Sequence, residues 1–176
     1  IEHLNFAVEV DGGVWAHKLP QFDKMQNELR AGAKALFARD FSGNEITAEL
    51  SYEMWKASQD LNYGDMRFGV SGGYARSFGF FSVEAGLGYL YDKVNMRDKA
   101  SHFVLPRAKV MFDLEKASFV PYVEINSSVQ QNDISSLYAQ NPYIDYSSMA
   151  NKLSSMVNSC NYNIALGFTG TVFSSR

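Results

Sequence analysis

The feature that most constrains the fold of this 176-residue chain is an alternation of apolar and polar residues with a period of two. It recurs in eight stretches, which cover residues 4–11, 28–37, 45–54, 66–74, 81–91, 104–113, 119–128 and 161–172. The apolar positions of these stretches number 40 and none is charged, whereas the opposite positions carry 14 charged residues. Because successive side chains of a β-strand point to opposite faces, the pattern predicts eight strands that share one charge-free face.

The connections between these stretches alternate in length. Residues 18–27, 57–65, 92–101 and 130–159 form long connections, and residues 40–44, 77–79 and 114–118 form short ones. Long loops on one rim and short turns on the other are typical of membrane barrels, whose tilted strands need about 9–11 residues to cross the hydrocarbon. We therefore expect an all-β fold: one antiparallel up-and-down transmembrane β-barrel domain over residues 1–176, with eight strands visible.

Composition removes several other classes of protein. The net charge of −3 gives no basic footprint for nucleic acid, and no run of about 18 apolar residues forms a membrane helix. Cys160 is the single cysteine, so no disulfide forms within the chain. The first residue is Ile rather than Met, so either an export leader was removed or the sequence is a piece of a longer chain. We expect a precursor with an export leader and a protein of the bacterial outer membrane.

The same alternation also describes a soluble lipocalin-type barrel, in which the apolar face lines a ligand cavity. Two observations favour the membrane. The charged face is rich in small residues such as Gly69, Gly86 and Gly88, which leave room for long side chains inside a narrow bore. The apolar face carries tyrosines near the strand ends, where an aromatic girdle lies: Tyr74, Tyr89, Tyr91 and Tyr162.

Charged residues on the inward face need partners, because a buried unpaired charge is costly. Five basic and five acidic residues form a balanced set that predicts an interior salt-bridge network and a plugged bore: Glu9, Arg30, Lys34, Glu49, Glu53, Arg67, Glu84, Arg107, Lys109 and Glu124. A gated or narrow conduction path is the alternative interpretation of the same residues.

Catalysis and metal binding find little support. The three histidines, His3, His17 and His102, form no His-x-Ser pattern on a strand, so we expect rim histidines, no catalytic residues and no enzymatic activity. They are too few and too scattered for a metal site, and the glycines belong to strands rather than to a phosphate-binding turn. We therefore expect neither a metal nor a cofactor.

The last long loop is the most individual part of the chain. Tyr138, Tyr143, Tyr146 and Met149 are candidate recognition residues for an extracellular protein partner, because loops on a rigid scaffold often bind. The spacing of Met149, Leu153 and Met156 suits a short amphipathic helix. A loop that packs on itself above the barrel is the alternative.

The hairpin from Phe68-Gly69-Val70-Ser71-Gly72-Gly73-Tyr74 to Val83-Glu84-Ala85-Gly86-Leu87-Gly88-Tyr89 resembles those of small outer-membrane barrels of the OmpA membrane-domain and OmpX type. The resemblance covers the whole chain and implies contact with the lipid bilayer and lipopolysaccharide, and a role in envelope integrity, adhesion or small-solute passage. Such barrels commonly end in an aromatic residue. Phe173 is close to the end but not terminal, so a fragment of a larger barrel is a second expectation.

The function that we expect is therefore that of an outer-membrane β-barrel with a structural, adhesive or binding role. A narrow channel, or part of a larger porin-like barrel, is one alternative. A soluble lipocalin-type ligand binder is the other.

Overall fold

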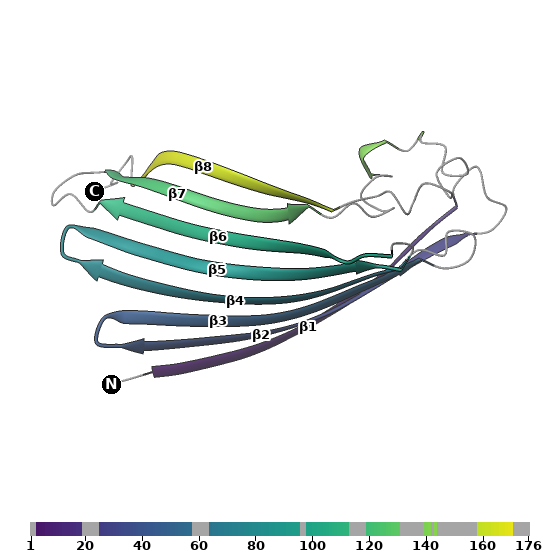
Figure 1. Ribbon diagram of the computed structural model, residues 1–176, viewed down its shortest axis with the longest axis horizontal. Coiled ribbons are helices and arrows are strands. Elements are labelled where there is room, and N and C mark those ends of the chain that lie inside the picture. Colours follow the sequence, from purple (N-terminus) through teal and green to yellow (C-terminus); the bar gives the residue numbers. More distant parts are fainter. Residues whose placement is uncertain are drawn as a thin grey trace, which may run out of the picture.

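The protein forms one antiparallel sheet in which eight strands follow one another in chain order (Figure 1). The computed structural model describes residues 3–18, 25–57, 64–95, 98–112, 119–130, 139–141, 143 and 158–170. The strands are β1 His3–His17, β2 Gln26–Phe41, β3 Asn44–Ala57, β4 Gly64–Phe78, β5 Phe81–Val94, β6 Ser101–Phe112, β7 Phe119–Gln130 and β8 Ser159–Gly170. The prediction of eight antiparallel up-and-down strands is confirmed.

Tight turns close the sheet's hairpins at one end, on the left in Figure 1. Between β2 and β3, Ser42 and Gly43 have φ values of 51° and 75°, the pair of positive angles that a type I′ turn needs. Between β4 and β5, Gly79 has a φ of 67°. We call this end the turn end, and the opposite end, where the long connections lie, the loop end. The short connection at 114–118 lies outside the described residues.

The strands run 12 to 16 residues, and all except β8 are longer than the alternating stretches in the sequence. Asp65 and Asp92, assigned to long connections by the sequence pattern, lie inside β4 and β5, and that assignment was wrong. The hydrogen-bonded ladder continues past the last apolar outward residue, so the period-two signal ends before the strand does.

The register joins the eight predicted apolar faces into one. Phe37 pairs with Ala48, Ala48 with Gly72, and Gly72 with Leu87, so each predicted outward residue meets another. Most of these side chains are exposed; Leu87 is 60% exposed. Among the residues that the structure describes, only Trp55, Ala57 and Val94 are buried hydrophobics. A single layer with so much exposed apolar area is typical of a membrane protein, not of a soluble one.

Two aromatic bands border the outward face. Phe78 and Phe81 stack at 5.1 Å at the turn end, and Phe68 and Tyr91 pair across β4 and β5 toward the loop end. Phe68 and Phe78 are ten residues apart, which is about 33 Å along a strand and about 25 Å across a bilayer at a 40° tilt. That spacing equals the height of the apolar band of outer-membrane barrels.

The seam between β6 and β7 is shorter than the others, because their register runs only from Ala108 to Met111 on β6. Pro106, which has no N–H to donate, lies just beyond. The Ser127 hydroxyl of β7 donates to the Pro106 carbonyl of β6 at 2.7 Å and bridges the seam there. The Tyr162 hydroxyl of β8 reaches over to the Val104 carbonyl of β6 at 3.0 Å. The sheet therefore stays continuous across a proline.

The sheet is open. In the described part of the chain β1 pairs only with β2 and β8 only with β7, so both outer strands have an unpaired edge. No helix within the described ranges is long and apolar enough to cross a membrane.

Candidate functional site

The face opposite the apolar one carries nearly all the charge of the strands. Reading the register from strand to strand places all ten residues of the predicted interior network on this inner face. It also adds six carboxylates that the network did not include: Asp11, Glu28, Asp40, Glu45, Asp65 and Asp92. The inner face of the described strands thus holds eleven carboxylates and five cationic side chains, an acidic excess of six.

Two ion pairs of the predicted network are formed. Lys34 Nζ lies 3.1 Å from Glu49 Oε2, and Arg30 Nη2 lies 3.5 Å from Glu53 Oε1. These four side chains are 31% to 51% exposed, so water screens the pairs and each contributes about 1 kcal/mol or less. They line a wetted surface rather than fill a sealed interior.

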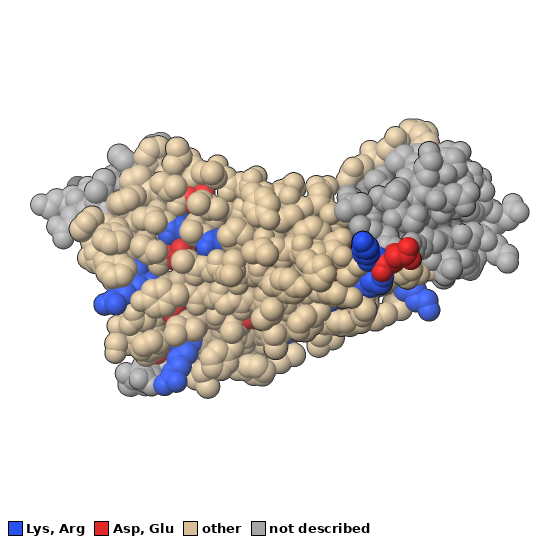
Figure 2. Space-filling model, in the orientation of Figure 1, with Lys and Arg blue, Asp and Glu red and all other residues tan. Residues whose placement is uncertain are grey.

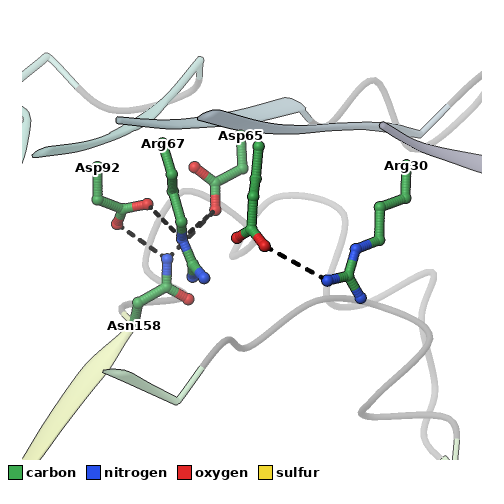
Figure 3. Close-up of polar contacts among 6 residues, drawn as sticks. Arg30, Asp65, Arg67, Asp92 and Asn158 are labelled. Atoms are coloured by element: carbon green, nitrogen blue, oxygen red, sulfur yellow. Dashed lines mark hydrogen bonds and ion pairs between the residues drawn. The ribbon is translucent and has the colours of Figure 1, made fainter. Parts of the chain in front are cut away.

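Arg67 lies in a buried cluster at the loop end instead of joining Glu53, its register partner. Its Nε donates to Asp92 Oδ1 at 3.1 Å and lies 3.8 Å from Asp65 Oδ2. Asn158, just before β8, donates its amide to both carboxylates, at 2.8 Å to Asp92 and 3.2 Å to Asp65 (Figure 3). One guanidinium and one amide therefore hold two buried carboxylates together.

Trp55 is the apolar wall of this cluster. The guanidinium carbons of Arg30 and Arg67 lie 5.1 Å and 4.9 Å from its ring centroid. Such cation–π contacts stabilise a cationic side chain where water is scarce. Trp55 thereby links the exposed Arg30–Glu53 pair to the buried Asp65–Arg67–Asp92 cluster.

Asn158 makes the longest-range contact of the cluster. It is 1% exposed, and it joins the start of β8 to β4 and β5, although β8 pairs only with β7 among the described strands. In the described part of the chain, Asp65 Oδ1, Arg67 Nη2 and Trp55 Nε1 are buried without a hydrogen-bond partner. Asn158 therefore ties the start of β8 to β4 and β5 at the loop end of the inner face.

Arg107 lies flat across the middle of the inner face. Thr47, Gly73, Gly86 and Arg107 form one row over β3, β4, β5 and β6, and Arg107 Nη2 reaches Thr47 Oγ1 at 3.5 Å. A Cβ at Gly73 would lie 2.7 Å from Arg107 Nη2, and one at Gly86 would collide with the arginine's Nε. These two glycines are therefore the floor on which the arginine side chain lies.

Two hollows lie beside Arg107. The larger, about 480 Å³, is lined among others by Glu45, Glu84, Lys109 and Glu124. The smaller, about 200 Å³, includes Ser71 in its lining. Lys109 pairs in register with both Glu84 and Glu124, and its ammonium lies 5.0 Å from the ring centroid of Tyr122. The larger hollow is thus lined by three carboxylates and two cationic side chains, Arg107 and Lys109.

Most of the other candidate residues lie outside the part of the chain that the structure describes. These are Tyr138, Tyr146 and Met149, the predicted helix at Met149–Met156, and the side chains of His3 and His17. Tyr143 is 92% exposed. His102 faces outward and its Nδ1 is hydrogen-bonded to the Tyr89 hydroxyl, as a rim histidine would be. No metal-binding group of three or more His, Cys, Asp or Glu occurs among the described residues.

A one-layer antiparallel sheet with a lipid-compatible outer face and a charged inner face has the fold of an outer-membrane β-barrel. Solved structures of outer-membrane proteins share it. OmpT of Vibrio cholerae in its in-vitro folded trimer form is 10% identical, with a TM-score of 0.55 over 96% of this chain and 48% of that one. Outer-membrane expressed OmpT of Vibrio cholerae is 14% identical, with a TM-score of 0.53 over 72% of this chain and 45% of that one.

A loop L8 deletion mutant of the same OmpT gives 13% identity and a TM-score of 0.52, over 68% of this chain and 42% of that one. No protein-family model and no curated protein matches the sequence. The chain thus spans less than half the length of the OmpT structures that it matches. The likeness supports an outer-membrane barrel and does not confirm the resemblance to the small OmpA and OmpX type.

Proposed function

We propose that this chain forms part of the wall of a water-filled, cation-preferring channel in the outer membrane, in a barrel of more than eight strands. The acidic excess of six on the inner face is the observation that carries this proposal. A cleft lined with one sign of charge concentrates the opposite ion, and rings of Asp and Glu favour cations in channels. The proposal includes no catalytic step.

The plugged bore expected from the sequence requires equal numbers of acidic and basic side chains on the inner face. The ten residues predicted for the network are five acidic and five basic. Six further carboxylates share their face, so five cationic side chains cannot neutralise eleven carboxylates. Charged side chains such as Lys34 and Arg30 also keep two fifths to half of their surface exposed. A hydrated lumen accommodates both features, whereas a sealed eight-stranded bore would bury them.

The size comparison supports a wider barrel. The strands described here form an open sheet, and the match covers only 42% to 48% of the OmpT structures. Eight strands leave room only for side chains, while barrels with more strands enclose an aqueous channel.

Planar-bilayer recordings of the full-length protein test this function. We expect steady conductance. In a KCl gradient we expect a reversal potential whose sign shows that K⁺ permeates more readily than Cl⁻. In the Glu84→Gln/Glu124→Gln variant we expect the cation-to-anion permeability ratio to fall about twofold or more, because two of the three carboxylates that line the larger hollow lose their charge.

The Arg39→Gln/Arg76→Gln variant is the matched control, since it also changes two charges near the turn end but on the outward face. Its selectivity should equal that of the wild type. Folded protein that inserts without conducting would contradict the channel and favour the plugged barrel. Anion preference in the wild type would contradict the role of the acidic face.

A further inference from the structure

The charged side chains on the outward face of the described strands all have the same sign. Among the described strand residues four charged side chains face outward, and all are basic: Arg39, Lys56, Arg76 and Lys93. All eleven carboxylates of the same strands face inward. Hydrophobicity alone explains why charge avoids the middle of this face, but it does not explain why no carboxylate lies at either rim.

The four basic residues lie near the strand ends, and the two lysines lie beyond the last outward aromatic residue of their strands. Lys56 is four residues beyond Tyr52, and Lys93 is two beyond Tyr91, both at the loop end. Arg39 and Arg76 lie at the turn end. The face drawn in Figure 2 carries both blue and red side chains toward the two ends of the sheet, with a largely uncharged band between them. Long basic side chains at such positions reach the lipid headgroups.

Lys56 and Lys93 are close enough to act together. Lys56 pairs with Gly64 on β4, and Lys93 pairs with Met66 on the same strand, so the two lysines flank β4. Two strand spacings and a two-residue offset put their Cα atoms about 12 Å apart. Gly64 between them has no side chain. Lys93 Nζ donates to the Asp98 carbonyl at 3.0 Å, which holds its ammonium at the rim.

We propose that Lys56 and Lys93 form a binding site for the phosphate groups of lipopolysaccharide. The long connections mark the extracellular rim of an outer-membrane barrel, so the loop end faces the leaflet that contains this phosphorylated glycolipid. Two ammonium groups complement phosphate, and the absence of outward carboxylates on the described strands removes repulsion. The inference depends on the orientation of the sheet and not on whether the barrel conducts.

The turn-end arginines provide a matched comparison. Arg39 and Arg76 also face outward, and the Arg76 guanidinium lies 4.8 Å over the Phe78 ring. They belong to the opposite rim, which faces the other leaflet. Removing them changes the net charge of the protein as much as removing the two lysines does.

The test measures binding of fluorescent lipopolysaccharide to the full-length protein in detergent micelles, with heat-modifiable gel migration to confirm folding. We expect Lys56→Gln/Lys93→Gln to weaken binding about tenfold and Lys56→Arg/Lys93→Arg to retain it. Arg39→Gln/Arg76→Gln should bind as the wild type does. Dephosphorylated lipopolysaccharide should bind the wild type as weakly as intact lipopolysaccharide binds the double glutamine variant.

Three outcomes would overturn the proposal. Equal weakening by the lysine and arginine variants would show that net charge alone attracts the lipid. Unchanged binding by the double glutamine variant would place the site elsewhere. Displacement of the lipid by millimolar inorganic phosphate would assign the two lysines to a free anion.

Discussion

Replacing Arg67 by methionine should destabilise the protein by about 3–5 kcal/mol, because two buried carboxylates would lose their only cationic partner among the described residues. Asp65 and Asp92 are 3% and 1% exposed, so water cannot replace the guanidinium. The Asn158 amide would remain as a neutral donor to both carboxylates. Denaturant unfolding of the full-length protein in lipid vesicles measures the loss.

The matched control is Arg30→Met. It also removes a guanidinium, but from an exposed arginine on β2 that pairs with Glu53 on β3. It should cost about 1 kcal/mol or less, since Arg30 is half exposed. Combining Arg67→Met with Asp65→Asn and Asp92→Asn should restore most of the stability. If Arg67→Met costs no more than Arg30→Met, the Asp65–Arg67–Asp92 cluster is hydrated in the assembled protein rather than buried.

Replacing Leu87 by arginine should cost about 2–4 kcal/mol, the range measured for Arg near the midplane of a lipid-facing barrel surface. Leu87 lies on the outward face of β5 between Phe81 and Tyr91, so lipid would surround the new charge. Vesicle-based unfolding titrations of the full-length protein measure this cost.

Ser71→Arg serves as the control for Leu87→Arg. Ser71 lies on the inner face of the adjoining strand, lines the smaller hollow, and pairs in register with Glu49. A guanidinium there has water and a carboxylate within reach, so the substitution should change stability by less than about 1 kcal/mol. A larger cost at Ser71 than at Leu87 would invert the assignment of the two faces.

Which residues lie on each face of the sheet could be predicted from the sequence, because lipid excludes charge from one of the two faces. A strand in a bilayer must keep charge off every second residue, and Leu50, Val70 and Leu87 follow that rule without help from neighbours in space. Turn chemistry was equally local: Ser42-Gly43 supplies the two positive φ angles of the β2–β3 turn.

The strand ends could not be predicted in the same way. At Lys56, Gly64 and Lys93 the outward residues are no longer apolar, so the alternation ends although the hydrogen bonds continue. Asp65 and Asp92 were therefore assigned to loops, and the inner face was expected to be balanced rather than acidic. The signal that could have found them is the phase of the alternation, which places both on the inward side.

The contacts of Asn158 could not be predicted from local pattern at all. Its partners are 93 and 66 positions away in the sequence. Arg107 is an intermediate case. Its glycine floor at Gly73 and Gly86 was visible as a surplus of small residues on the charged face, but the row that joins them depends on the register of four strands.

The central claim is that the outer face contacts lipid and the inner face contacts water. A cysteine scan of β3 tests it most directly, in full-length protein whose Cys160 is replaced by serine. The scanned positions are Thr47, Ala48, Glu49, Leu50, Ser51 and Tyr52. Fluorescent labels at positions 48, 50 and 52 should be quenched by lipid-soluble quenchers, and those at 47, 49 and 51 by water-soluble ones, with a period of two. If the protein stays folded without detergent and labels at positions 48, 50 and 52 lie in a closed cavity, the apolar face points inward. That result would contradict the membrane barrel and favour a soluble ligand binder.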